Sequence, residues 1–157
     1  NLLLCCTECG RFKGIQFPLQ VDGVPLLLDP SVENPWDHLD FDPITGRLTA
    51  RYRVELGDYS PKGVHTVQVL RLDREHLEGQ YRKTYRRLCR VLEEFGEIPE
   101  GAGQDLAEAL RCADDHGLLG WWIEGIGTGD PPLAKFKKRR PELWRECEVI
   151  LSRTLSA

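Results

Sequence analysis

The chain has 157 residues, of which 41% are hydrophobic, enough for one folded domain or for a small domain with a helical extension. This composition excludes an intrinsically disordered chain, and no apolar run approaches the roughly eighteen residues that a membrane-spanning helix needs. The net charge of −4 argues against a protein that coats nucleic acids by bulk electrostatics, because that mode requires a basic surface.

Residues 1–58 have the composition of a loop-rich α+β unit made of short strands and turns. The apolar residues 2–5 predict a buried strand, while Asp22-Gly23 and Thr45-Gly46 are typical of tight turns between strands. Because Asn1 leads directly into the apolar run and the chain contains no Met, we expect further residues before Asn1 in the gene product.

Residues 59–157 predict a mostly helical region, which we treat as a second domain. Ser60-Pro61 is a typical helix start, and from about Asp73 an apolar stripe at helical spacing continues to Phe95, with Gly96 as the stop. Three further segments predict helices, the last of them one helix or two joined near Pro141: Gln104–His116, Leu118–Ile123 and Leu133–Leu155.

Of the six cysteines, only Cys5, Cys6 and Cys9 cluster, so a disulfide scaffold is not indicated and a reducing cytoplasm is expected. Cys6 and Cys9 form a C-x2-C pair, whose thiolates can bind one tetrahedral Zn²⁺. A lone pair of this kind is also compatible with redox chemistry or with no special role. The redox interpretation requires Cys6 at the start of a helix within an α/β layer, and the glycine-containing segment after Cys9 gives it poor support.

The opening sequence resembles the second half of HNH endonucleases, in which an Asn-Leu-apolar strand leads into C-x2-C and then Lys-Gly. The residues concerned are NLLLCCTECGRFKG at 1–14 and Phe17-Pro18-Leu19. Later segments extend the resemblance to the HNH nucleases of Septu-type and retron-associated antiphage systems, in which the nuclease works with an ATPase partner: 27–30, 33–35, 37–41 and 45–47.

The resemblance implies a ββα-metal (HNH) unit that lacks its first part in this chain, followed by the helical region. It assigns Asn1 to the central catalytic Asn, and Cys6 and Cys9 to the second half of a structural Zn²⁺ site completed by ligands upstream of Asn1. The catalytic His also precedes Asn1, so it is not in this chain. A catalytic Mg²⁺ or Mn²⁺ would stabilise the charge that develops on the phosphodiester.

One position departs from the family pattern. Gly10 stands where the family places a metal-binding Asn or His, so either the site is degenerate or a ligand from the segment around Asp29 or His38 substitutes. Lys13 keeps its place in the pattern and is a candidate phosphate contact, although a solvated lysine fits equally well.

Two functions follow from these residues. The first is a subunit of a metal-dependent HNH-type DNA endonuclease in prokaryotic antiphage defence, with DNA and an ATPase as partners. The second is a catalytically degenerate, zinc-stabilised module with the HNH fold that binds nucleic acid or assembles a complex.

Other chemistry-bearing residues favour structural roles. His38 is expected to pack at the start of a strand, and Trp121-Trp122 to pack in the helical core rather than form an exposed platform. Two basic clusters are interpreted as solvated helix faces or as interaction surfaces: one over residues 82–90 and one over residues 135–140.

Overall fold

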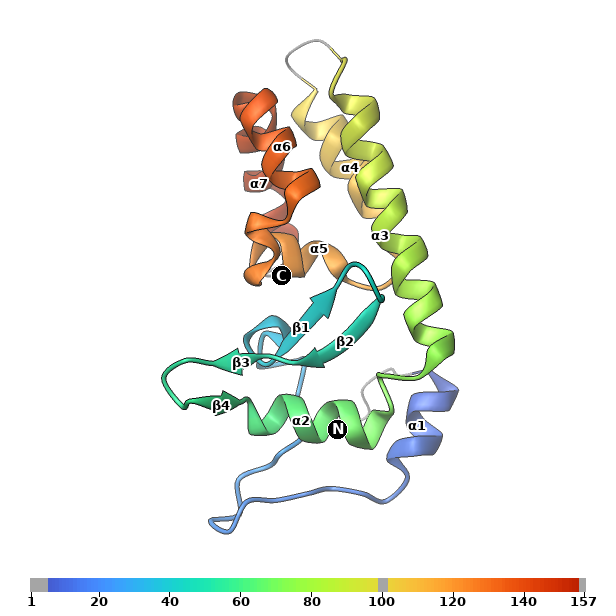
Figure 1. Ribbon diagram of the computed structural model, residues 1–157, viewed down its shortest axis with the longest axis vertical. Helices are drawn as coiled ribbons and strands as arrows, with labels where there is room; N and C mark the ends of the chain where they lie inside the picture. The colour runs from blue at the N-terminus through green and yellow to red at the C-terminus, as the bar shows by residue number, and fades with distance from the viewer. Residues whose placement is uncertain (1–5, 99–101, 156–157) are drawn as a thin grey trace. The chain divides into compact units, whose positions relative to one another are not determined.

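The computed structural model describes residues 6–98 and 102–155 and contains both helices and antiparallel strands, which confirms the α+β class (Figure 1). The chain divides into two compact units, residues 1–78 and residues 79–157, and the division falls within helix α3 (Glu75–Phe95). Within the described residues, no helix is long and apolar enough to cross a membrane.

The first unit is built around two small antiparallel hairpins. Strand β1 (Leu39–Asp42) pairs with β2 (Arg47–Ala50), and strand β3 (Tyr52–Arg53) pairs with β4 (Asp58–Tyr59). The 3-10 helix η1 (Pro35–Asp37) leads into β1. The expected turn at Thr45-Gly46 is confirmed, because Gly46 joins β1 to β2 with a φ of 79° that favours glycine. The expected turn at Asp22-Gly23 is also confirmed, although only one isolated bridge flanks it.

Helix α2 (Pro61–Leu70) belongs to this first unit because it packs directly on the β1–β2 hairpin. The Ser60 hydroxyl accepts a hydrogen bond from the Gly63 N–H, as expected of the residue before a helix. The expected domain boundary after residue 58 falls within β4, whereas the compact unit continues through α2. The buried apolar side chains of this unit come from the first hairpin and from the segment before it: Leu26, Trp36, Leu39, Phe41 and Leu48.

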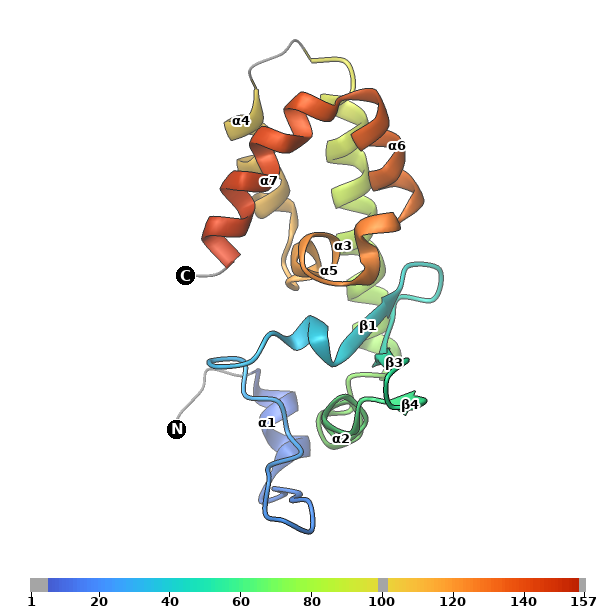
Figure 2. The same cartoon turned by 90° about the vertical axis from the view of Figure 1, so that its left-hand side faces the viewer.

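Helix α1 (Thr7–Lys13) was not expected from the sequence, where Gly10 and Gly14 indicate turns. It forms because the Cys6 sulfur accepts a hydrogen bond from the Cys9 N–H at its start, and because Gly14 ends it with a φ of 47°. It packs against α2 (Figures 1 and 2). The strand predicted over residues 2–5 lies outside the described residues.

The second unit is a helical assembly with a single apolar core. Its elements after α3 are α4 (Gly103–Ala113), α5 (Leu118–Ile123), the 3-10 helix η2 (Ile126–Gly129), α6 (Pro131–Arg139) and α7 (Pro141–Leu155). Of the two alternatives for the last predicted segment, one helix or two joined near Pro141, the structure has two helices, and α7 contacts α4, α5 and α6 (Figure 2). The side chains of this core are almost completely buried: Leu88, Leu106, Leu110, Trp122, Leu133 and Leu151.

Two acidic residues fix the turns of this unit. The Asp114 carboxylate accepts hydrogen bonds from the N–H groups of Leu118 and Leu119, at 2.9 and 2.8 Å, so α4 ends at Ala113 and not at the expected His116. The buried Asp130 accepts hydrogen bonds from the Tyr85 hydroxyl and the Trp122 indole N–H, which ties α3 and α5 to the start of α6. Trp121 and Trp122 are 5% and 0% exposed, as expected for core residues.

The contact between α2 and the first hairpin predicts the effect of one substitution. A Cβ at Gly63 would lie 2.1 Å from the His38 carbonyl oxygen, a backbone atom that cannot move independently of β1. We expect Gly63→Ala to reduce the free energy of unfolding by about 1–3 kcal/mol in urea titrations, because α2 must move away from the hairpin.

Gly79 provides the matched control, since a Cβ there has no atom within 4 Å and the residue lies inside helix α3. Gly79→Ala should stabilise the protein by roughly 0.5–1 kcal/mol through helix propensity. Equal effects of the two alanines would contradict the close packing of α2 on the hairpin.

Candidate functional site

The C-x2-C pair lies at the start of α1. Cys6 is the residue before the helix and is exposed, whereas Cys9 lies in the first turn and is partly buried. The Cys9 N–H donates to the Cys6 sulfur at 3.3 Å, and this hydrogen bond is the main cause that lowers the pKa of the Cys6 thiol. Burial raises the pKa of the Cys9 thiol. The two thiols of the pair therefore differ in acidity.

Arg74 brings the two sulfurs into one electrostatic environment. Its Nη2 lies 3.5 Å from the Cys9 sulfur and 4.0 Å from the Cys6 sulfur, and it also forms an ion pair with Glu8 at 3.3 Å. The guanidinium carbon lies 5.4 Å from the centre of the Phe12 ring. A cation in this position favours the thiolate form of both cysteines.

The other terminal nitrogen of the same guanidinium caps the C-terminal end of α2. Arg74 Nη1 donates to the carbonyl oxygens of Leu70 and Arg71, at 3.0 and 2.9 Å, where the helix leaves carbonyl groups without intrahelical partners. Arg71 adopts a left-handed conformation there, with a φ of 51°. Arg74 thus joins the cysteine pair of α1 to the last turn of α2. It could not have been found from the sequence, because it lies 65 residues after Cys9 and belongs to no motif.

The donor set fits half of a tetrahedral zinc site. Zinc binds thiolates, and the N–H group and the guanidinium beside these sulfurs both favour deprotonation. Within residues 6–98 and 102–155, the structure contains no group of three or more potential ligands that could hold a metal. Asp29 and His38, the suggested substitutes for the residue at Gly10, therefore do not join Cys6 and Cys9 in such a group.

The other described residues named in the HNH resemblance take no part in the contacts of Arg74 with Cys6 and Cys9. Asn1 lies outside the described residues. Gly10 lies in α1, where its N–H donates to the Cys6 carbonyl at 3.0 Å, and it offers no side-chain ligand. Lys13 lies in the last turn of the same helix, with its ammonium 6.0 Å from the centre of the Phe17 ring. The Asp29 carboxylate accepts hydrogen bonds from the N–H and the hydroxyl of Ser31.

His38 has the structural role expected of it. Its Nδ1 lies 2.7 Å from the Ser60 hydroxyl oxygen, and that oxygen also accepts from the Gly63 N–H. This contact is one hydrogen bond between the imidazole and the hydroxyl, and the tautomer of the ring decides which of the two groups donates. Burial lowers the pKa of His38 below its ordinary 6.5.

Replacement of Arg74 tests the connection between α1 and α2. In Arg74→Gln, the carbonyl groups at the end of α2 lose their donors and the cysteine pair loses its cation. We expect a loss of about 1–3 kcal/mol in the free energy of unfolding, measured by urea titration. The exposed neighbour Arg71 is the control, because Arg71→Gln removes the same charge and should change stability by less than about 0.5 kcal/mol.

The environment of His38 predicts a pH dependence of stability. Because the folded protein lowers the pKa of His38, the unfolded chain binds more protons, and the stability present above pH 6.5 is lost as the pH falls below 6.5 and through the lower pKa of the folded state. We expect urea titrations at about pH 7.5 and 5.5 to show a smaller pH-dependent loss in His38→Gln than in the unmodified protein. The pKa of His116 is also lowered, by burial, so some dependence should remain until both histidines are replaced. An unchanged pH dependence in the double variant would contradict this assignment.

Comparison with known proteins adds no relative to this description: no family model, no curated protein and no solved structure matches the chain.

Proposed function

We propose that the chain is part of a subunit of a metal-dependent HNH-type DNA endonuclease that acts in prokaryotic antiphage defence. In this proposal, Cys6 and Cys9 provide two of the four ligands of a structural Zn²⁺, and the others come from residues upstream of Asn1. The single observation in the structure that supports the zinc part of the proposal is the pair of C-x2-C sulfurs that face one guanidinium, that of Arg74. The resemblance of residues 1–14 and of the segments up to residue 47 to HNH nucleases supports the same function.

Arg74 supports a zinc site for an electrostatic reason. Zinc bound by several thiolates carries excess negative charge, and a guanidinium that donates to a ligand sulfur offsets it and orients the ligand. The side chain of Arg74 is only 14% exposed, so its charge is little screened by water. The same cation would equally favour a reactive thiolate, but α1 packs against helix α2 and not in an α/β layer, as the redox interpretation requires.

The catalytic part of the proposal depends on residues before Asn1 and on Asn1 itself. The resemblance implies that a His activates water there and that a bound Mg²⁺ or Mn²⁺ supplies charge stabilisation for cleavage. It also implies an ATPase as the protein partner. Within the described part of the chain, Lys13 is the residue proposed to contact a phosphate.

The second candidate is a zinc-stabilised module that keeps the HNH fold without its chemistry. Gly10 favours it, because this position in α1 has no side chain to bind a catalytic metal. Both candidates require the structural zinc, and they differ in whether the protein cleaves DNA.

Elemental analysis of the full-length protein tests the zinc site. We expect about one Zn²⁺ per chain, as one set of four ligands binds one ion, and loss of this zinc in Cys6→Ser and Cys9→Ser. Chelation should also unfold the first unit, because structural zinc contributes on the order of 10 kcal/mol to folding. Cys112→Ser is the control, since Cys112 is an exposed cysteine in α4 and its replacement should leave the zinc content unchanged. Zinc-free protein with reduced, intact cysteines would contradict the site.

Plasmid cleavage then separates the two candidates. If the protein is a nuclease, it should cut DNA with Mg²⁺ or Mn²⁺, alone or with its partner, and Asn1→Ala should lower the rate by several orders of magnitude. Protein that contains zinc and does not cut under any of these conditions would establish the degenerate module instead.

A further inference from the structure

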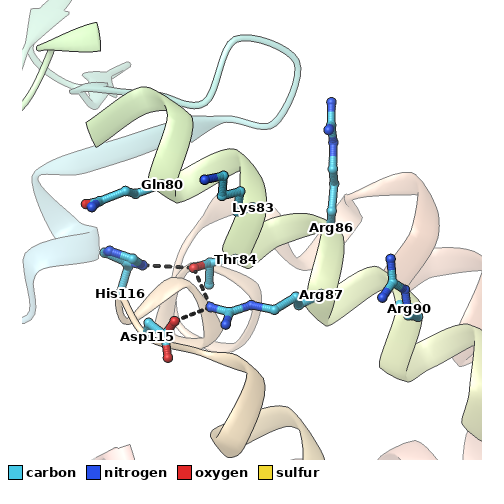
Figure 3. Close-up of a pocket in the computed structure, with 8 residues that line it drawn as sticks. All are labelled: Gln80, Lys83, Thr84, Arg86, Arg87, Arg90, Asp115 and His116. Atoms are coloured by element: carbon cyan, nitrogen blue, oxygen red, sulfur yellow. Dashed lines mark hydrogen bonds and ion pairs between the residues drawn. The ribbon is translucent and has the colours of Figure 1, made fainter. Parts of the chain in front are cut away.

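The outer face of α3 carries a shallow pocket in the second unit. Figure 3 shows its lining side chains, which come from α3 and from the segment between α4 and α5. The pocket has a volume of about 500 Å³. Four cations and one carboxylate line it, together with a neutral histidine and smaller polar groups: Lys83, Arg86, Arg87, Arg90, Asp115 and His116.

Most of these cations have no partner inside the protein. In the part of the chain that the structure describes, the side chains of Lys83, Arg86 and Arg90 form no hydrogen bond or ion pair. The next carboxylates along α3 are Glu93 and Glu94, about one turn beyond Arg90, and no ion pair joins Arg90 to either within the described residues. The pocket is therefore an uncompensated positive region on a chain whose net charge is −4.

The fourth cation is held in place. Arg87 forms an ion pair with Asp115 and donates to the hydroxyl of Thr84 at 3.1 Å. Thr84 is completely buried and its hydroxyl lies 2.8 Å from Nδ1 of His116. The ring of His116 in turn packs against Tyr81, with the ring centres 5.2 Å apart. These contacts fix one wall of the pocket.

The other basic cluster of the sequence differs in this respect. On α6 and just after it, Lys137 pairs with Glu148, Arg139 with Glu97, and Arg140 donates to the Gly96 carbonyl. Carboxylates thus compensate Lys137 and Arg139, while Lys135 and Lys138 form no ion pair within the described residues. In the cluster on α3, by contrast, Arg87 is the one cation with an ion pair among the described residues.

The spacing of the cations selects the kind of anion. Lys83 and Arg90 are seven positions apart, which corresponds to about 10 Å along a helix. A single phosphate cannot reach a row of this length, whereas duplex DNA carries about one phosphate charge per 1.7 Å of its axis. We propose that this α3 pocket binds the phosphate backbone of a nucleic acid, with Lys83, Arg86 and Arg90 as the contacting residues and Arg87 as the fixed wall. The binding is independent of sequence, because phosphates carry no base information. The proposal goes beyond the nuclease function, since it requires neither zinc nor a catalytic metal.

Fluorescence anisotropy with a labelled DNA duplex of arbitrary sequence tests the site in the full-length protein. The titrations contain EDTA in place of divalent ions, so that cleavage cannot interfere, and they are repeated over a range of salt concentrations. Arg86→Gln/Arg90→Gln removes two phosphate contacts. The plot of the logarithm of the association constant against the logarithm of the salt concentration should therefore become less steep by about 1.8. At about 0.1 M salt the same change should weaken binding roughly 50-fold.

The matched control removes two charges from α6. Lys135→Gln/Lys138→Gln changes the net charge equally, and this variant should bind DNA within about threefold of the unmodified protein. Circular dichroism of both variants verifies that they are folded.

The outcomes are distinct. Equal loss of binding in the two double variants would show a general charge effect and would overturn the proposal that the α3 pocket binds nucleic acid. Tighter binding of an acidic peptide such as polyglutamate than of DNA would overturn it as well. Loss confined to the α3 variant supports the pocket even if the protein does not cut DNA. Conversely, cleavage by a protein whose α3 variant still binds normally would leave the nuclease intact and refute this inference.

Discussion

The first unit depends on a single guanidinium that serves two helices at once. Arg74 donates to the last carbonyl groups of α2 on one side and faces the sulfurs of α1 on the other. Helix α1 has only seven residues, too few to be stable alone, and its own residues are not buried, so its position is determined by this contact and by packing on α2. A lysine would not reproduce this arrangement, because Arg74 uses two separate nitrogens, Nη1 toward α2 and Nη2 toward the sulfurs, whereas the donors of a lysine share one nitrogen. The cysteine pair, the candidate zinc site and the end of α2 therefore share one structural element.

Much of the helical architecture could be predicted because the signals are local. The stripe along α3 and the Ser60-Pro61 start of α2 each depend on residues within a few positions, and both are confirmed. At Pro141, where one helix or two fitted the sequence, the structure has two. The features that could not be predicted involve distant partners or side-chain capping. Arg74 acts across 65 positions, and Asp114 ends α4 early because its carboxylate binds the next helix. Helix α1 was missed because glycine suggests a turn, whereas here Gly14 ends a helix.

The candidate site could be predicted in part. The C-x2-C spacing alone indicated Cys6 and Cys9, and the structure adds the cation that favours their thiolates. The sequence could not show which cations of the two basic clusters are paired, because the acidic partners of α6 lie on α7 and in the segment after α3. The net charge of −4 excluded a uniformly basic surface. It could not predict local charge, because local charge depends on which side chains form ion pairs.

The buried hydroxyl of Thr84 has a consequence for binding entropy. Long cationic side chains lose rotamer freedom when they contact a ligand, at a cost of roughly 0.5–1.5 kcal/mol for each one. Arg87 has already lost this freedom on folding, because Thr84 and Asp115 hold its guanidinium. A phosphate that approaches the pocket thus meets one preorganised cation beside three free ones. Arg87 can therefore determine the position at which a phosphate first binds. The side chains of Lys83, Arg86 and Arg90 can change rotamer to contact further phosphates along α3.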